Sequence, residues 1–216
     1  MTTVAVIDYG MGNIRSVAKA LEYVGQAHNG KKVQVIVSQQ PEQILCADHI
    51  VFPGVGALRD CMSELQRLEL ADAIRECAAT KPFLGICLGM QALLDDSEEN
   101  NGTPGLAIIT GHARHFATSI DNAALKIPHM GWNRVRQLAN HKLWRGIEQD
   151  SRFYFVHSYY VDPTSDAHVA ATTDYGCDFA SAIAHNNIFA VQFHPEKSQH
   201  AGLQLLKNFI AWDGAQ

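Results

Sequence analysis

Four short apolar segments in the first half of the chain constrain its fold more than any other feature. They span residues 4–7, 33–37, 50–56 and 83–86. The first is apolar without alternation, which indicates a strand buried on both faces. Helical patterns at residues 14–24 and 65–79 separate these strands, and such alternation favours a parallel sheet with right-handed crossovers. We therefore expect an α/β fold with a mostly parallel central sheet and helices on both faces.

The second half of the chain has shorter strand-like segments and no long helical pattern between them. Short strand-like segments separated by Gly, Asn, Asp and Pro predict a smaller antiparallel section. These segments cover residues 106–110, 112–116, 132–137, 153–160, 168–172, 179–184 and 188–193. A final helix is expected at residues 200–212. A chain of 216 residues without repeats, low-complexity tracts or linkers is expected to form a single domain over residues 1–216.

Cys87 stands where a strand is expected to turn directly into a helix. Residues 83–86 form the apolar run, Gly85 and Gly89 flank the cysteine, and a helical pattern starts at Met90. Small flanking residues allow a strained strand-to-helix elbow, which presents its corner side chain at the top of a sheet. The helix N-terminus at this corner favours a thiolate. The alternative is a buried structural cysteine, because most cysteines are of that kind.

His194 and Glu196 follow the last expected strand, at residues 188–193. Residues two apart in an extended chain point to the same side, and Pro195 favours an extended backbone. We therefore expect Glu196 to orient the imidazole of His194, whose other nitrogen faces a nucleophile. A base oriented by a third group is the arrangement of a catalytic triad, here Cys87, His194 and Glu196.

Three glycine-containing segments fall where parallel strands are expected to end. They are residues 8–13, 53–56 and 87–91. Ligands of such sheets bind at the carboxyl ends of the strands, so we expect these segments to share one rim. Gly54 and Gly56 let backbone N–H groups approach a ligand closely, although a plain tight turn is the alternative. The first segment lacks the third glycine of a dinucleotide fingerprint, and no acidic residue ends the second strand, so nucleotide binding is not expected.

The composition argues against several classes of function. A formal net charge of -5 without any Lys/Arg run argues against a nucleic-acid binder. Five cysteines without a C-x-x-C pair suggest neither a disulfide framework nor a zinc knuckle, and they fit a reducing cytosol. No basic leader and no apolar run of membrane-spanning length occur, so a cytoplasmic protein without membrane attachment is expected. His112 and His115 form an H-x-x-H pair without a third ligand, which favours exposed histidines over a metal site, and no cofactor is expected.

These residues carry a resemblance to a known family. Gly-Ile-Cys-Leu-Gly-Met-Gln at residues 85–91, together with His-Pro-Glu at residues 194–196, resembles the class I (triad) glutamine amidotransferases. Pro-His-Met-Gly-Trp-Asn at residues 128–133, Phe-Val-His-Ser-Tyr at residues 155–159 and residues 8–13 resemble the glutaminase subunits of imidazole glycerol phosphate synthases. The resemblance extends from about residue 4 to the last helix, and it implies the flavodoxin-like fold of this family.

The resemblance implies that the chain hydrolyses glutamine through a γ-glutamyl thioester. Cys87 would attack the side-chain amide, His194 would move the protons, and Glu196 would set the tautomer of the imidazole. Backbone N–H groups of Leu88 and of Gly54 or Val55 would stabilise the oxyanion, each by about 3 kcal/mol in the transition state.

The resemblance also assigns residues to the substrate's amino-acid end, namely Gln91 and the backbone at Ser158 and Tyr159. The complete expected substrate-binding set is Gly54, Gly56, Leu88, Gln91, Ser158 and Tyr159. For His129 and His157 we prefer a structural, hydrogen-bonded role to a catalytic one.

A separate partner is implied as well. The family passes ammonia to a (β/α)₈-barrel cyclase subunit, which makes imidazole glycerol phosphate and an aminoimidazole carboxamide ribotide. We expect a 1:1 heterodimer, with Asn13, Trp132 and Lys197 at the interface because they flank the rim segments. Two alternatives stay open, a triad glutaminase that serves another synthase, such as one that amidates a surface sugar, and a non-catalytic binding protein that keeps the fold.

Overall fold

The computed structural model describes residues 1–26, 32–116 and 125–215. The first half contains β1 (Thr2–Ile7), α1 (Ile14–Gln26), β2 (Val33–Ser38), α2 (Pro41–Leu45), β3 (His49–Gly54), α3 (Leu58–Arg67), α4 (Leu70–Thr80), β4 (Phe83–Cys87) and α5 (Leu88–Gln91). The second half contains β5 (Asp96–Ser97), η1 (Glu99–Asn101), β6 (Thr103–Pro104), β7 (Gly111–His115), β8 (His129–Arg134), β9 (Arg136–Gln137), η3 (Lys142–Trp144), β10 (Arg152–His157), β11 (Tyr159–Pro163), η4 (Asp166–His168), β12 (Val169–Asp174), β13 (Asp178–His185), β14 (Ile188–Val191), η5 (Pro195–Lys197) and α6 (Gln199–Ala211).

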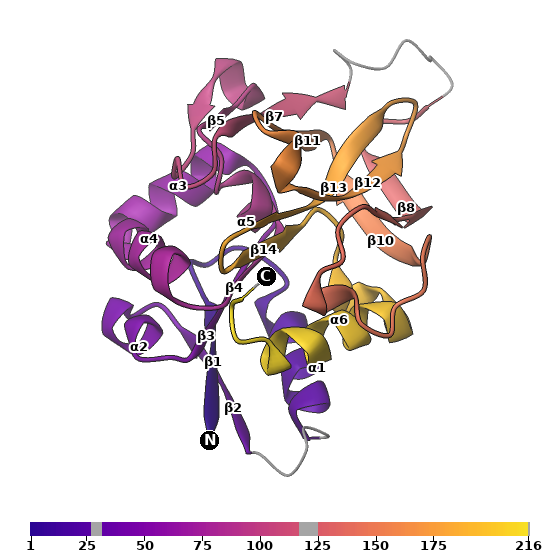
Figure 1. The fold of residues 1–216 in the computed structure, drawn as a ribbon. Coiled ribbons are helices and arrows are strands. Elements are labelled where there is room, and N and C mark those ends of the chain that lie inside the picture. The colour runs from indigo at the N-terminus through magenta and orange to yellow at the C-terminus, as the bar shows by residue number, and fades with distance from the viewer. Residues whose placement is uncertain (27–31, 117–124, 216) are drawn as a thin grey trace.

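The main sheet is parallel at one end and antiparallel at the other. Its order is β2-β1-β3-β4-β14-β13-β11-β7-β5-β6, and the first five of these strands run parallel. From β13 the pairing becomes antiparallel, except that β5 runs parallel to β7. A separate antiparallel pair, β8 and β10, lies beside this end of the sheet (Figure 1). The last strand in sequence, β14, therefore lies next to β4, which brings the residues after both strands together.

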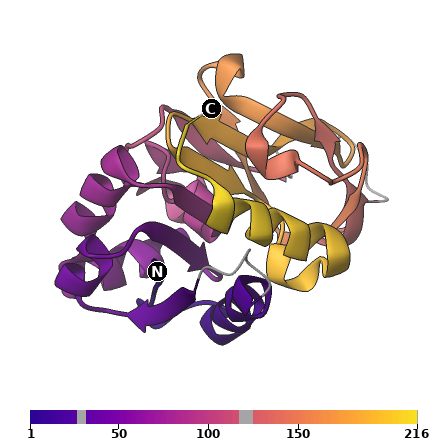
Figure 2. The same ribbon diagram turned by 60° about the horizontal axis from the view of Figure 1, so that its bottom comes forward.

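Two cores lie on opposite faces of the parallel strands. Along β1, Val4 and Val6 pack into the core that contains α1 and α6, whereas Ala5 and Ile7 pack into the core with α2, α3 and α4. This alternation buries both faces of the strand, which explains its continuous apolar sequence. Figures 1 and 2 show the two helix layers on either side of the sheet. The expected fold class, a mostly parallel sheet with helices on both faces and an antiparallel section, is confirmed.

The single helix expected at residues 65–79 is wrong. The structure has two helices there, α3 and α4, which are separated at Leu68 and Glu69. Glu69 adopts a left-handed conformation with φ 55°, which stops the first helix although no Gly or Pro marks the point. Apolar residues continue at helical spacing on both sides of the turn, so the sequence gives one uninterrupted pattern.

The strand expected at residues 106–110 is also wrong. The N–H groups of Leu106, Ala107, Ile108 and Ile109 donate to the carbonyls of Ala92, Leu94, Leu93 and Leu93 respectively. This segment therefore satisfies the carbonyls that follow α5 instead of pairing with a strand. Leu106 and Ile109 are buried, so a packed loop produces the same apolar pattern as a strand.

The strand expected at residues 153–160 is interrupted at Ser158. Residues before it form β10, which pairs with β8, and residues after it form β11, which pairs with β7 and β13. The expected segment 132–137 likewise divides into β8 and β9. The final helix, α6, lies within one residue of its expected position. Within the described ranges, no helix has the length and apolar character needed to cross a lipid bilayer.

Candidate active site

Cys87 occupies the corner between β4 and α5. Its backbone has φ 54° and ψ -109°, a strained conformation for a residue with a side chain, which costs on the order of 1–3 kcal/mol. A Cβ on Gly89 would lie 1.9 Å from the carbonyl oxygen of Phe52, and one on Gly85 would lie 3.0 Å from the Cβ of Ala190. Both flanking glycines are therefore required by close packing, and the elbow expected from the sequence is present.

His194 and Glu196 lie just beyond β14, the neighbour of β4. His194 Nδ1 and Glu196 Oε1 are 2.8 Å apart, and both side chains are buried. The extended backbone expected through Pro195 is wrong, because residues 195–197 form the 3₁₀ turn η5. The turn nevertheless brings the carboxylate back to the imidazole. Ser198 Oγ donates to the carbonyl of His194 and holds the turn in place.

The charges around His194 favour its protonated form. Burial alone lowers the pKa of His194, but the Cys87 thiolate and the Glu196 carboxylate outweigh it and raise the pKa to about 10. Because Nδ1 is bonded to Glu196, Nε2 is the nitrogen left for the thiol, and Nε2 is buried without a hydrogen bond of normal length. The arrangement favours the imidazolium form of His194 beside the Cys87 sulfur.

A cavity of about 280 Å³ opens beside Cys87. Its walls come from Val55, Gly56, Cys87, Leu88, Gln91, Glu99, Pro128, Val156, His157, Ser158 and Tyr159. Of the expected substrate-binding residues, only Gly54 is not in the wall. Gly54 lies behind it, because a Cβ there would lie 2.3 Å from the hydroxyl of Tyr9 and 2.9 Å from the Cβ of Leu88. The structure thus gathers all six expected residues around one cavity.

The amide of Gln91 has a fixed orientation in the cavity wall. Its Nε2 donates to the carbonyl oxygen of Tyr159 at 3.0 Å and to Gln192 Oε1 at 3.1 Å. Both amide protons are used in this way. The Oε1 atom of Gln91 therefore remains as an acceptor for a ligand in the cavity.

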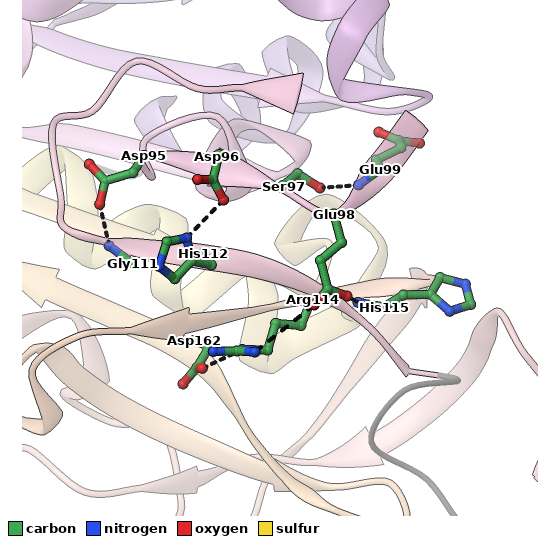
Figure 3. A network of polar contacts seen from close by, with 10 residues as sticks. All are labelled: Asp95, Asp96, Ser97, Glu98, Glu99, Gly111, His112, Arg114, His115 and Asp162. Carbon is green, nitrogen blue, oxygen red and sulfur yellow. Dashed lines mark hydrogen bonds and ion pairs between the residues drawn. The ribbon is translucent and has the colours of Figure 1, made fainter. Parts of the chain in front are cut away.

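Glu99 lines the cavity, although its position in the sequence does not predict a role in the site. Its Oε2 accepts a hydrogen bond from the N–H of Leu58 at 2.6 Å, and its own N–H donates to Ser97 Oγ. Figure 3 shows Glu99 beside a network that ties β5, β7 and β11 together. In the sequence it is one of several acidic residues in a polar stretch, so no local signal distinguishes it. Its carboxylate is the one acidic group among the described residues that line the cavity.

The same network accounts for the H-x-x-H pair. His112 Nδ1 lies 2.8 Å from Asp96 Oδ1, and the neighbouring Arg114 Nε donates to Asp162 Oδ2 at 2.6 Å (Figure 3). The N–H of His115 donates to Glu98 Oε2. In the described part of the chain, no three His, Cys, Asp or Glu side chains are grouped so that they could hold a metal ion.

His157 in the cavity wall forms a buried pair with His129. His129 Nδ1 lies 3.0 Å from His157 Nε2, and His157 Nδ1 lies 2.8 Å from the carbonyl oxygen of Tyr159. A carbonyl can only accept, so His157 carries its proton on Nδ1 and His129 donates to His157. Burial lowers the pKa of His129 to about 4 and that of His157 to about 3, so both rings are neutral at pH 7.

Two of the three expected interface residues lie together. Trp132 on β8 and Lys197 on η5 both contact Tyr154 on β10, with the Trp132 ring centroid 6.1 Å away and Lys197 Nζ 5.8 Å away. Trp132 is 43% exposed and Met130 on the same strand is 62% exposed. Asn13 is half-buried at the start of α1, which contacts η5.

Known proteins resemble this chain in sequence and in fold. The family described as glutamine amidotransferase class-I matches residues 5–212. The imidazole glycerol phosphate synthase subunit HisH of Nitrosococcus oceani is 58% identical over 214 residues, which cover 99% of both chains. The protein of the same name from Methylococcus capsulatus is 56% identical over 217 residues, which cover 99% of this chain and 98% of that one.

Solved structures extend the likeness in fold to more distant proteins. A crystal structure of a glutamine amidotransferase has a TM-score of 0.71 at 15% identity and covers 97% of this chain and 99% of its own. Another, from Thermotoga maritima, has a TM-score of 0.61 at 17% identity and covers 90% of this chain and 76% of its own. The chain belongs to the class-I glutamine amidotransferase family and, within it, to the HisH subunits.

Proposed function

We propose that this chain is the glutaminase subunit of an imidazole glycerol phosphate synthase and that Cys87, His194 and Glu196 are its catalytic residues. The observation that carries the proposal is the buried, 2.8 Å contact between His194 and Glu196 at the strand end beside the Cys87 elbow. Residues 1–216 would act as one amidotransferase domain, in the cytoplasm. Similarity to HisH over 99% of the chain favours this function over that of a glutaminase that serves another synthase, such as one that amidates a surface sugar.

Hydrolysis proceeds in two halves. The Cys87 sulfur attacks the side-chain amide carbon of glutamine, and the imidazolium of His194 gives its proton to the departing nitrogen, which leaves as ammonia. The resulting γ-glutamyl thioester is attacked by water, whose proton His194 accepts. The thiolate then leaves, and glutamate is released. Throughout, Glu196 holds Nδ1, so that Nε2 is the nitrogen that exchanges protons.

Oxyanion stabilisation comes from the backbone around the cavity. The first N–H groups of α5 have no carbonyl within the helix, and Leu88 is the first residue of α5. Val55 and Gly56 also line the cavity, directly after Gly54, which pairs with Cys87 in the sheet. Donors on both sides would contact the tetrahedral oxygen, and removal of such a donor typically costs about 3 kcal/mol.

The amino-acid end of glutamine carries a positive ammonium and a negative carboxylate. The carboxylate of Glu99 and the free Oε1 of Gln91 are acceptors suited to the ammonium. The backbone at Ser158 and Tyr159 lies in the same wall and suits the carboxylate through its N–H groups. These contacts leave the side-chain amide directed toward Cys87.

The ammonia would be used by a cyclase subunit of (β/α)₈-barrel fold in a 1:1 heterodimer. Trp132 and Lys197, which share Tyr154 as a neighbour, and Asn13 are our candidates for the contact surface. The cyclase would join the ammonia to the phosphoribulosyl aminoimidazole carboxamide nucleotide and release imidazole glycerol phosphate and the carboxamide ribotide.

A glutaminase assay tests the proposal. Glutamate release would be measured from the purified chain alone, with the cyclase subunit, and with the cyclase subunit plus its nucleotide. We expect slow hydrolysis by the chain alone and at least tenfold faster hydrolysis in the complete mixture, since the Gly54–Gly56 turn can reorient its peptides when the partner binds. Absence of glutamate in every mixture would refute the function, and full activity of the chain alone would refute the dependence on a partner.

A further inference from the structure

Gln192 is a buried polar residue beside the Cys87 nucleophile. It follows β14, two residues before His194, and has no exposed surface. Its Nε2 donates a hydrogen bond to the Cys87 sulfur at 3.6 Å, and its Oε1 accepts from Gln91 Nε2 at 3.1 Å. Its own N–H is bonded to the carbonyl of Ser181, which fixes the backbone. The side chain therefore joins the nucleophile to the cavity wall.

The orientation of these amides follows from a single atom, the carbonyl oxygen of Tyr159. This oxygen can only accept, so the atom of Gln91 that faces it must be the NH₂ group. The same NH₂ group faces Gln192, so Gln192 must present its oxygen there. The NH₂ group of Gln192 is then left to face Cys87. Flipping either amide would place two donors or two acceptors against each other.

The donor-to-acceptor direction of these hydrogen bonds, from Gln91 through Gln192 to Cys87, decides where the thiol proton can lie. The Cys87 sulfur accepts from Gln192, so its own proton cannot point toward Gln192. His194 Nε2, which has no hydrogen bond of normal length, remains as its partner. After the proton moves to His194, the sulfur is an anion and its bond to Gln192 becomes charge-assisted, which is the stronger kind.

We propose that Gln192 is a positioning residue that holds the Cys87 sulfur as a hydrogen-bond acceptor and ties it, through Gln91, to the wall that binds substrate. The proposal rests on the function assigned to Cys87. Gln192 does not touch the substrate. It stabilises the thiolate and fixes the direction of the sulfur relative to the bound amide.

Two substitutions separate the two ends of the side chain. Gln192→Glu keeps an oxygen for Gln91 but replaces the donor to Cys87 with an acceptor. Gln192→Met keeps the volume and removes both hydrogen bonds. Gln43→Glu on the exposed surface of α2 makes the same chemical change far from the site and serves as the matched control.

The readout is the rate at which iodoacetamide alkylates Cys87, followed by mass spectrometry of the peptide across pH 5–10. His194, charged beside Glu196, also acts on Cys87, whereas burial raises the pKa of Tyr9 so that its phenol stays uncharged across this pH range. All three residues stay unchanged in every variant. We expect the pH midpoint of alkylation to rise by about one unit in Gln192→Met and by more in Gln192→Glu. The midpoint of Gln43→Glu should equal that of the unsubstituted chain.

The complex with the cyclase subunit provides a second readout. Gln192→Glu should lower kcat for glutamine at least tenfold while KM changes less than threefold, because Gln91 keeps its partner. Gln192→Met should also raise KM, because the amide of Gln91 is then free to turn. An unshifted alkylation midpoint in both folded variants would overturn the proposal.

Alkylation needs neither glutamine nor a partner, so failure of the two proposals can be told apart. A shifted midpoint together with an inactive unsubstituted complex would contradict the glutaminase function alone. An active complex with an unshifted midpoint would contradict the role of Gln192 alone. Melting temperatures of both variants distinguish a shift of the midpoint from loss of the fold.

Discussion

Gly89 packs so closely on Phe52 that a Cβ added to Gly89 would lie 1.9 Å from the Phe52 carbonyl oxygen. This contact joins the first turn of α5 to the strand β3. It sets the position of Cys87 relative to the Gly54–Gly56 turn, which begins two residues after Phe52. The elbow and the neighbouring turn in the cavity wall are therefore fixed against each other by one backbone contact.

Gly89→Ala should destabilise the chain and abolish glutamine hydrolysis. Overpacking against backbone costs about 1–3 kcal/mol, and relief of the clash must move Cys87. Gly146→Ala is the matched control, because Gly146 has φ 74° but its nearest atom would be 3.7 Å from a Cβ, so the cost is about 1–2 kcal/mol of backbone strain. Urea unfolding should show similar losses of stability in the two variants. The glutaminase assay should show loss of activity in Gly89→Ala alone. Retained activity in Gly89→Ala would contradict the proposed role of this contact.

Glu196→Gln should reduce kcat/KM much less than His194→Ala. A glutamine can still offer an oxygen to Nδ1, so about a tenfold loss is expected, whereas removal of the base should cost at least a thousandfold. The Glu196 charge also helps to raise the pKa of His194 to about 10. Its removal lowers that pKa, so the alkaline limb of the pH–rate profile should move to lower pH. Equal losses in two folded variants would show that Glu196 does more than orient and charge the ring.

His157→Gln should make stability less sensitive to acid. The native ring has a pKa of about 3 because of burial, while the unfolded chain takes up the proton near pH 6.5. Below pH 6.5 the unfolded state therefore binds more protons, and stability falls as pH decreases toward 3. At pH 5 the titration of His157 alone lowers the free energy of unfolding by about 2 kcal/mol relative to its value well above pH 6.5. The free energy of unfolding in urea at pH 7.5, 6 and 5 tests the slope, with exposed His200→Gln as the control that should keep it.

Cys87→Ala should abolish glutamine-dependent synthesis but leave the ammonium-driven reaction of the complex intact. Alanine provides no nucleophile, and the remaining donors cannot make an amide reactive. The substitution removes little volume, so the contact surface should survive. Both activities would be measured on one reconstituted complex, with ammonium salt supplied at alkaline pH. Loss of the ammonium reaction as well would mean that Cys87 shapes the complex.

Trp132→Ala should weaken binding of the cyclase subunit by roughly tenfold or more. Exposed tryptophans at interfaces commonly contribute about 2 kcal/mol. Leu138→Ala is the matched control, since Leu138 is 54% exposed but lies outside the Trp132–Tyr154–Lys197 group. Calorimetric titration of the two variants with the cyclase would compare the affinities. Unchanged affinity for Trp132→Ala would remove β8 from the proposed interface.

Much of the fold could be predicted because its determinants are local. The non-alternating apolar sequence of residues 4–7 correctly indicated a strand buried on both faces, and glycines on both sides of Cys87 correctly indicated the elbow. The break at Glu69 and the loop at residues 106–109 could not be predicted, because tertiary packing decides them. Glu69 adopts a left-handed backbone conformation although glutamate has no special preference for it. The loop bonds to the carbonyls of the residues that follow α5, which reach it only in the folded chain.

The candidate site divides in the same way. Cys87, His194 and Glu196 stand in recognisable short patterns, whereas Glu99 is held at the cavity by contacts that include a bond to the distant Leu58. Gln192 and Cys87 are 105 residues apart in the sequence, so no local pattern predicts their contact. Residues whose roles depend on such long-range contacts can be recognised only in three dimensions.

The carbonyl oxygen of Tyr159 also limits the routes by which protons can reach or leave Cys87. It accepts from both Gln91 and His157, so each hydrogen-bond chain that ends on it has one permitted direction. His157 and the histidine behind it stay neutral until the pH falls to about 4, and an amide does not conduct protons. Neither chain can therefore deliver a proton to Cys87 or remove one. The protons that hydrolysis consumes or releases therefore pass between His194 and the cavity rather than along either of these two chains.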